Sequence, residues 1–375
     1  MTKLWILMAI CIPIAYIIDN RDYYSLREEK PRQERLLTII LILVLGFFCG
    51  LRVWGNDTVT YLQMFEREPK LGEIFSSGIT FEFSEGIGFH YVTSLLKTIG
   101  FSSQDFLMFF AFLTVIPYVI FVHKYSENMV FGVFLMLTTG FYTFSMAAIK
   151  QSVAIGFCLI AVIYAIEKKW ILYAIWMFIA CMFHPYAIIY LVVPLLMFKP
   201  WTKKTAFFVA IMVCAGIFMG PLIQTVLDVT SLMGADYSED AFSGAGVNIF
   251  RVIVSFVPMI FATVYGKDLF KESTRADNLI FNLAMMNALI MFVGLFGTAN
   301  YFARLANYFL PAQVIVVPWI LKRLKKKDRK WLTIACVVGY TGYFIYEHAI
   351  IRPFDTGYSQ ISLFEYLKQL VLGEN

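Results

Sequence analysis

Long apolar runs alternate with short polar segments along almost the whole chain. A helix needs about 20 apolar residues to cross a bilayer, and fewer where its ends carry side chains that reach the headgroups. The pattern therefore predicts an all-α polytopic membrane protein. We expect about twelve membrane-spanning helices, near residues 4–18, 36–51, 106–122, 129–144, 147–166, 170–183, 185–198, 205–222, 249–265, 279–296, 305–321 and 331–346.

The segment 86–100 fits this series poorly, because it is short for a span and contains His90 and Lys97. A thirteenth span, a re-entrant helix and an interfacial amphipathic helix are all compatible with its length. With twelve spans and both termini outside, about two thirds of the 31 Lys and Arg residues fall on one side, as the positive-inside rule requires. A thirteenth span would break this agreement. We therefore treat 86–100 as a re-entrant or amphipathic helix on the outer face.

The composition agrees with a membrane protein, since 59% of the residues are hydrophobic and only 15% are charged. A soluble domain is about half apolar and a quarter charged. The net charge of +5 does not indicate a nucleic-acid partner, because the basic residues lie in short loops between apolar segments. The six cysteines lie in or beside apolar runs and form no CxxC pair, so neither a disulfide framework nor a zinc site is indicated. We expect one integral membrane domain, 1–375, with outer loops at 52–105 and 223–248 and an outer C-terminal tail at 347–375.

Four cations stand at the predicted outer ends of different helices: Arg52, Lys150, Arg251 and Arg304. Ionisable groups in such positions are functional candidates when they face the interior of a bundle. The alternative is that each side chain snorkels to the outer surface. His184 ends another span, where it is either a buried histidine bonded to a backbone carbonyl or a general base.

The stretch that follows the second span places Trp54, Asp57 and Tyr61 shortly after Arg52. A guanidinium offers forked donors that match phosphate oxygens. The Gly-Asn pair between the tryptophan and the aspartate permits a turn that would bring Asp57 back toward Arg52. The alternative is a plain helix end with an interfacial tryptophan.

Three further stretches combine polar and aromatic residues at the outer side. Gln151 follows Lys150 at the start of an apolar run, and a late outer turn places Tyr301 and Tyr308 around an arginine. Glu85 precedes the short segment discussed above. An aromatic belt and a solvated turn are the alternatives here. The chain has no Asp-x-Asp motif, so a metal ion held by that motif is not indicated. It also has no glycine-rich phosphate loop, so an ATPase is not indicated.

Short motifs containing these residues occur in a fixed order along most of the chain. They are Arg52 with Gly55-Asn56-Asp57 and Tyr61, then Glu85-Gly86, Lys150-Gln151 with Ala154, Phe183-His184, and Tyr301-Phe302-Ala303-Arg304. In this order they resemble the EpsG family of bacterial exopolysaccharide polymerases, in the Wzy-type group. The chain departs from the family pattern in having Lys150 where an arginine is usual, and Pro185 where a small residue usually follows the histidine.

The resemblance implies a GT-C-like fold and a metal-independent glycosyltransferase with no cofactor. It would polymerise undecaprenyl-pyrophosphate-linked oligosaccharide repeat units on the outer face of the bacterial cytoplasmic (inner) membrane. An acceptor hydroxyl would displace the lipid pyrophosphate at the anomeric carbon. The implied partners are the lipid-linked donor and acceptor, the bilayer and a chain-length regulator, with no nucleic acid.

The resemblance also implies roles for individual residues. The candidates for taking the hydroxyl proton are His184, Asp57 and Glu85. The candidates for stabilising the pyrophosphate are Arg52, Lys150, Arg251 and Arg304. The candidates for contacting sugars are Tyr61, Trp54, Gln151, Tyr301 and Tyr308. A lipid-linked glycan transporter (flippase) and an O-antigen ligase are the alternative functions, and the sequence separates the ligase from a polymerase poorly.

Overall fold

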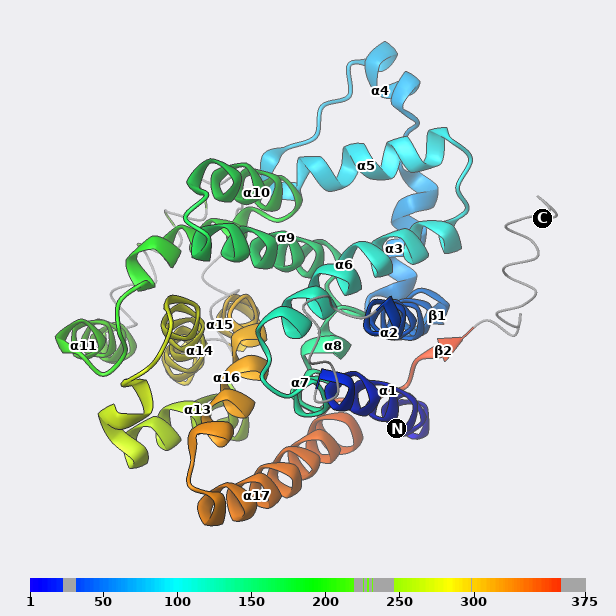
Figure 1. The fold of residues 1–375 in the computed structure, drawn as a ribbon. Coiled ribbons are helices and arrows are strands. Elements are labelled where there is room, and N and C mark those ends of the chain that lie inside the picture. Colours follow the sequence, from blue (N-terminus) through cyan, green and yellow to red (C-terminus); the bar gives the residue numbers. More distant parts are fainter. Residues whose placement is uncertain are drawn as a thin grey trace.

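The computed structural model describes residues 1–22, 32–218, 246–297 and 299–358, with the isolated positions 225, 228 and 231. Within these ranges the chain is predominantly helical (Figure 1). Its first half forms α1 (Thr2–Asp22), α2 (Arg32–Gly50), β1 (Arg52–Trp54), α3 (Thr58–Arg67), α4 (Leu71–Ser77), η1 (Phe83–Glu85), α5 (Ile87–Thr98), α6 (Ser103–Tyr125), α7 (Met129–Thr138), α8 (Phe141–Phe144) and α9 (Ile149–Ile166). Its second half forms α10 (Trp170–Phe183), η2 (Pro185–Leu196), α11 (Lys203–Ile217), α13 (Ile249–Tyr265), η4 (Gly266–Phe270), α14 (Arg275–Val293), α15 (Ala299–Asn307), α16 (Leu310–Arg323), α17 (Lys326–Ile345), η5 (Tyr346–Ile351) and β2 (Gly357–Tyr358).

Five helices in the described ranges are long and apolar enough to cross a membrane, and the bent pair α15–α16 would make a sixth. Shorter apolar helices lie among them, namely α7, α10, η2 and α13. The α9 and α14 helices are mostly enclosed by the rest of the protein, whereas α1 and α17 are mostly exposed. A side chain exposed on an apolar helix of this kind faces lipid, so these helices confirm the all-α polytopic membrane architecture. The count of about twelve spans and the GT-C-like arrangement stay predictions.

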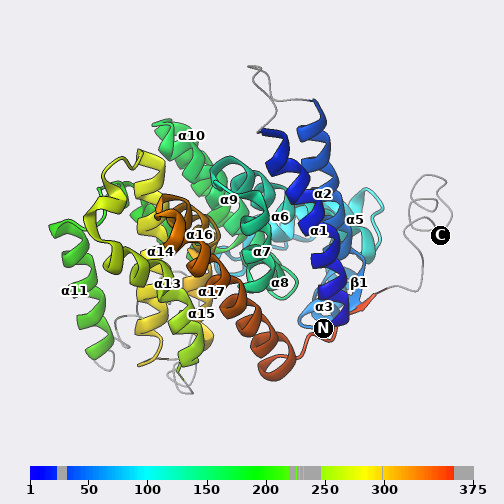
Figure 2. The same cartoon turned by 60° about the horizontal axis from the view of Figure 1, so that its bottom comes forward.

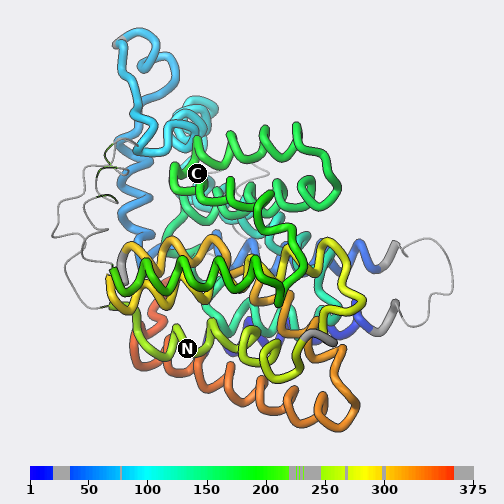
Figure 3. The backbone as a smooth tube through the Cα atoms, turned by 90° about the vertical axis from the view of Figure 1, so that its left-hand side faces the viewer, coloured from blue at the N-terminus to red at the C-terminus, as the bar shows by residue number. Residues whose placement is uncertain are grey.

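Most helices run side by side, whereas α3 lies across one end of them (Figure 3). At the opposite end, ion pairs join the connecting segments, with Lys124 2.9 Å from Glu167 and Arg323 2.6 Å from Glu127. This end therefore gathers the basic loops that the positive-inside rule assigns to the cytoplasm. The N-terminus lies at the end that carries α3 and β1 (Figure 2).

Strands β1 and β2 form a small antiparallel sheet that returns the C-terminal segment to the end of α2. Arg52 pairs with Tyr358, and Trp54 pairs with Gly357. A Cβ atom at Gly357 would fall within the indole ring of Trp54, so only glycine fits beneath that ring. The ammonium of Lys3 donates 2.6 Å to the Thr356 carbonyl, which joins the two ends of the chain.

This arrangement changes the expected limits of the outer segments. The predicted tail at 347–375 begins inside a helix, because η5 is a π-helical continuation of α17 that ends at Ile351. Residues 359–375 lie outside the described residues, as does most of the predicted loop at 223–248. The predicted loop at 52–105 contains one strand and three α-helices.

Segment 86–100 forms α5, whose two ends are both tied to the end of the protein that carries α3. Gly86, with φ +85°, lies so close to the Phe183 carbonyl that an added Cβ would be 2.4 Å from that oxygen. At the other end, the Lys97 ammonium donates to the carbonyls of Phe65 and Glu68. These contacts support the prediction that α5 does not span the membrane.

Three predicted spans differ in form from simple α-helices. The run at 185–198 is a 3₁₀-helix, η2, which rises about 2.0 Å per residue and so covers more depth than an α-helix of equal length. The run at 129–144 breaks at Gly140, where φ is +83°. The run at 305–321 belongs to two helices, α15 and α16, bent by 54°.

Candidate functional site

Lys150 lies in the first turn of α9 and reaches toward α5 and the turn before it. Its ammonium donates to the carbonyl of Glu85 at 2.7 Å and to Nε2 of His90 at 2.9 Å. It also lies 5.1 Å from the centre of the Phe89 ring, within the range of a cation–π contact. The half-buried ammonium is therefore bound by α5 and by the turn before it, and does not extend freely to the surface.

His90 links Lys150 to α3. Because its Nε2 accepts from Lys150, its Nδ1 carries the hydrogen and donates to the Glu68 carboxylate at 2.8 Å. The side chain of Glu68 is buried. A chain of hydrogen bonds thus runs from α9 through α5 to α3, and it fixes the position of Lys150.

His184 occupies the connection between α10 and η2. Its Nδ1 lies 2.8 Å from the hydroxyl of Tyr308, and the carbonyl of Tyr308 accepts a hydrogen bond from Tyr190. Burial, together with the smaller effect of the nearby positive charges of Arg304 and Lys150, lowers the pKa of His184 to about 3. The imidazole is therefore neutral, and it faces both cations.

Tyr61 on α3 lies against the start of α9. Burial raises the pKa of its hydroxyl, whereas hydrogen bonds from the backbone amides of Lys150 and Ile149 oppose that rise. The charges of Asp57 and Arg304 also act on this hydroxyl, in opposite directions. The amino end of α9, the carboxylate of Asp57 and the cation of Arg304 therefore meet at Tyr61.

Arg304 is exposed on α15, and its guanidinium makes no hydrogen bond or ion pair with other described residues. The backbone at this position is fixed, because the buried amide of Gln151 donates 2.6 Å to the Arg304 carbonyl. Beside it, the ring of Tyr301 meets that of Tyr186 edge to face, with 5.8 Å between centroids. We call Asp57, Tyr61, Lys150, His184 and Arg304 the polar cluster.

Arg52 lies outside the polar cluster and is 1% exposed. Its Nε donates to the Thr58 hydroxyl at 2.9 Å, and its Nη1 donates to the carbonyl of Cys49. The guanidinium thus joins the last turn of α2 to the first residue of α3. Asp57 is exposed and directly precedes Thr58, the first residue of α3. The turn between Arg52 and Thr58 therefore leads Asp57 toward Tyr61.

Glu85 contributes its backbone to the site through the hydrogen bond from Lys150, while its carboxylate is exposed. The Trp54 ring lies over Gly357 at the sheet. The predicted sugar-binding residues are therefore divided, because Tyr61, Gln151, Tyr301 and Tyr308 surround the polar cluster and Trp54 does not.

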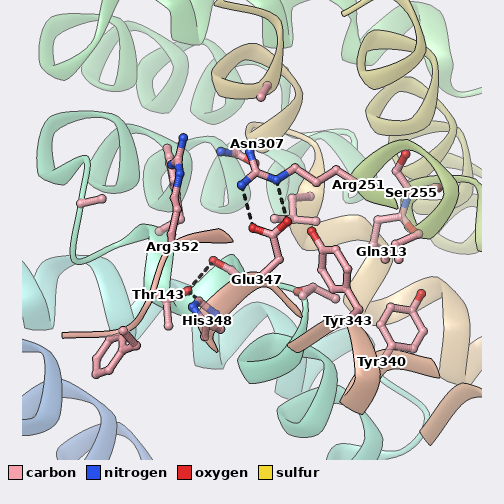
Figure 4. A pocket seen from close by; sticks show the side chains of 18 of the residues that line it. Thr143, Arg251, Ser255, Asn307, Gln313, Tyr340, Tyr343, Glu347, His348 and Arg352 are labelled. Atoms are coloured by element: carbon pink, nitrogen blue, oxygen red, sulfur yellow. Dashed lines mark hydrogen bonds and ion pairs between the residues drawn. The ribbon is translucent and has the colours of Figure 1, made fainter. Parts of the chain in front are cut away.

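Arg251 lies in a separate cavity of about 210 Å³, next to α15. Its Nε and Nη2 bind the two carboxylate oxygens of Glu347 at 2.8 and 2.7 Å, as Figure 4 shows. His348 follows on the same helical turn, with Nε2 3.3 Å from the Thr143 hydroxyl. We call this cavity the Glu347 pocket.

No sequence motif distinguishes Glu68, Glu347, His348 or Arg352. His90 was noted only because it makes segment 86–100 a poor span. A carboxylate and a histidine in the outer part of the last apolar helix were the available signal for the Glu347 pocket. Within the described ranges no group of three or more His, Cys, Asp or Glu residues is arranged to hold a metal ion.

Comparison with known proteins gives one match. The model of the EpsG family matches residues 35–363, which is most of the chain. No curated protein and no solved structure matches it.

Proposed function

The chain belongs to the EpsG family, whose members are Wzy-like polymerases, and from this premise we propose a specific reaction for it. It is a glycosyltransferase that joins undecaprenyl-pyrophosphate-linked oligosaccharide repeats at the outer face of the bacterial cytoplasmic membrane. Its termini lie on that same face. A chain-length regulator is a further proposed partner.

The observation that carries this proposal is that the charges of Lys150 and Arg304 both act on His184, while Arg304 and the amino end of α9 also meet at Tyr61. Backbone amides at a helix N-terminus bind anions, and flanking cations strengthen that binding. Arg304 is exposed and has no carboxylate partner in the described chain. A diphosphate bound here would accept donors from both side chains and from the helix.

The proposed reaction breaks the bond between the anomeric carbon and the diphosphate oxygen of the donor. The acceptor hydroxyl oxygen forms the new bond to that carbon, and the diphosphate leaves with the electron pair. Lys150 and Arg304 stabilise the developing negative charge. Metal independence is part of this proposal, because two protein cations supply the charge that a metal ion would otherwise provide.

His184 is the proposed acceptor of the hydroxyl proton. Its pKa of about 3 reflects burial and two nearby cations. A diphosphate between those cations would offset their charge and so raise the pKa of His184, while burial, the larger cause, would still hold it below its ordinary value. Asp57 is the second candidate, because its charge reaches Tyr61, whereas the carboxylate of Glu85 is exposed.

Arg52 takes a positioning role in this scheme. Its hydrogen bonds to Thr58 and Cys49 set the angle between α2 and α3 and so place Asp57 and Tyr61. Gln151 acts in the same way on α15, through the carbonyl of Arg304.

Arg304→Ala tests the diphosphate site in cells that lack the chromosomal gene. The expected result is loss of polymer together with accumulation of a single repeat unit on lipid. Arg67→Ala is the matched control, because Arg67 is an exposed arginine on α3 at the same end of the protein. Normal polymer from Arg304→Ala would overturn the site. Accumulation of an untranslocated cytoplasmic lipid-linked species would instead support a transporter.

A further inference from the structure

The Glu347 pocket takes no part in the reaction as described so far. It is lined by helices from distant parts of the chain. Figure 4 shows Arg251 of α13 and Gln313 of α16 around it, and Asn287 of α14 also lines it. Its volume of about 210 Å³ is below the roughly 300–1,000 Å³ of pockets that enclose drug-sized ligands. The space suits one ring with its substituents.

The charges around the pocket balance. Arg251 is paired with Glu347 through two short hydrogen bonds, and the side chains of Glu347 and Arg251 are 10% and 15% exposed. Arg352 and Asp355 also line the space and have opposite charges. A diphosphate would find no excess positive charge here, in contrast to the polar cluster. A neutral ligand with many hydroxyl groups matches the pocket better.

The lining also offers the groups that hydroxyls need. Asn287, Gln313 and Ser255 are all buried polar residues of the inner wall. Oε1 of Gln313 has no hydrogen-bond partner in the described chain. Such an atom carries a desolvation cost that a ligand hydroxyl would remove. The rings of Phe144 and Phe354 add apolar surface for the face of a sugar.

The pocket adjoins the polar cluster through two elements. Ala303 and Asn307 of α15 line it, while Arg304 of the same helix belongs to the cluster. Asn56 also lines it, next to Asp57 of the cluster. A ring held in the pocket is therefore next to the proposed diphosphate site.

We propose that the Glu347 pocket binds a sugar ring of the acceptor, with the Arg251–Glu347 pair and Asn307 as its hydrogen-bonding groups. This inference rests on the proposed function, because it assigns the second substrate of the same reaction. The pair presents both donors and a carboxylate, and the ring's hydroxyls bind to them. The hydroxyl that attacks then faces the polar cluster.

The test uses the purified full-length protein in lipid nanodiscs and two separate probes. The first probe is the free oligosaccharide, released by mild acid from the lipid-linked repeat of a gene-deletion strain. The second is undecaprenyl diphosphate, which has no sugar. Saturation-transfer NMR measures the first and a lipid-competition assay measures the second. The variants are Glu347→Gln, Asn307→Ala and Lys150→Gln, with Glu272→Gln as the matched control at the opposite end of the protein.

Glu347→Gln should weaken oligosaccharide binding about tenfold or more, because it removes hydrogen bonds to a charged carboxylate. Asn307→Ala should weaken it about fivefold, because the amide that it removes is neutral. Both should leave undecaprenyl diphosphate binding within about twofold. Glu347→Gln leaves Arg251 unpaired and can destabilise the fold. In that case Asn307→Ala decides, because it leaves the ion pair intact.

Unchanged oligosaccharide binding in Asn307→Ala and in any folded Glu347→Gln protein would overturn the inference. So would tighter diphosphate binding in Glu347→Gln, which would show that the freed Arg251 holds an anion. Lys150→Gln separates the two hypotheses. If it leaves diphosphate binding unchanged while the pocket variants lose the oligosaccharide, the proposed diphosphate site fails and the sugar pocket stands.

Discussion

The ammonium of Lys150 lies 2.9 Å from Nε2 of His90 and 2.7 Å from the carbonyl of Glu85. The helix α5 and the turn before it are thus joined to the first turn of α9 by one side chain. In the pattern of the EpsG family, arginine is usual at this position. A lysine serves here because its compact ammonium, with three donors, can bind His90 and Glu85 and keep one donor for a substrate.

The effect of a substitution at Lys150 on polymerisation should depend more on the charge of the new side chain than on its shape. Lys150→Arg should keep polymerisation, because a guanidinium can bind the same anion. Lys150→Gln should lower polymer roughly 100-fold, which is the cost typical of losing one donor to a developing anion. Lys150→Glu should abolish it by repelling the diphosphate. Glycan gels at matched membrane protein levels measure all three. Lys327→Glu, at the opposite end, is the control, and normal chains from Lys150→Glu would remove the anion-binding role.

Gly86 should tolerate no side chain. Gly86→Ala combines a strained positive φ with a Cβ only 2.4 Å from the Phe183 carbonyl, so η1 and α5 must shift away from Phe183, which disturbs their contacts with Lys150. Gly78→Ala has a similar φ of +68° but meets nothing within 4 Å. It therefore controls for backbone strain alone, about 1 kcal/mol. Polymer should be lost in the first variant and kept in the second. Equal polymer from both would show that the close approach does not position the site.

The apolar spans were predictable because lipid requires them. Segments 170–183 and 249–265 agree with α10 and α13 to the residue. Helical bends were not predictable from hydropathy, since the break between α15 and α16 depends on local packing and on Pro311 near the start of α16. The β1–β2 sheet was missed for another reason. It pairs three residues after α2 with a segment about 300 positions away, and such pairing leaves no periodic signal in either strand.

The polar cluster could be predicted only in part. Lys150, His184 and Arg304 each stand out as isolated polar groups at the ends of apolar runs, so the sequence identifies them singly. Their partners do not stand out, because Glu68 and His90 fall in the segment 52–105, which the sequence predicts as a loop and where charged residues are ordinary. The reassignment of Arg52 to a positioning role needed its burial, which sequence alone does not give.

Arg52→Ala should abolish polymer while the protein still inserts. It removes a buried donor to Thr58 and to the end of α2, at a cost of about 2–3 kcal/mol. Arg52→Lys should recover little, because one ammonium cannot replace a fork that spans both partners. Thr58→Val removes one of the two contacts and should give a partial defect. Polymer assays and apparent unfolding temperatures report both effects. Near-normal polymer from Arg52→Ala would show that α3 is positioned without it.

Topology can be tested with single added cysteines at opposite ends of the protein. Gln63→Cys on α3 should react with a membrane-impermeant maleimide added outside intact cells, and Lys327→Cys on α17 should react only after permeabilisation. Both positions are exposed. The unmodified protein, with its six native cysteines, gives the baseline. Labelling of Gln63→Cys only after permeabilisation would invert the proposed orientation.

Because of His184, the free energy of unfolding should decrease as the pH falls below 6.5, the ordinary pKa of histidine. Its pKa is 6.5 in the unfolded chain and about 3 in the folded protein. Between these values the unfolded state binds a proton that the folded state does not, so stability is greatest above pH 6.5 and decreases toward pH 3. From pH 7 to pH 5 the loss is at most about 2 kcal/mol. The apparent unfolding temperature of His184→Gln should therefore fall less over this range than that of the unsubstituted protein.

Substitutions at His184 distinguish a role as general base from a purely structural role. If His184 takes the proton, both His184→Ala and His184→Asn should lose turnover while undecaprenyl diphosphate still binds, since the diphosphate is held by Lys150 and Arg304. An asparagine can still hydrogen-bond to Tyr308, so it preserves the structural contact but cannot accept a proton at neutral pH. Full turnover in His184→Asn would leave Asp57 as the remaining candidate in the polar cluster. Asp57→Asn would then be expected to abolish turnover without weakening the binding of the diphosphate.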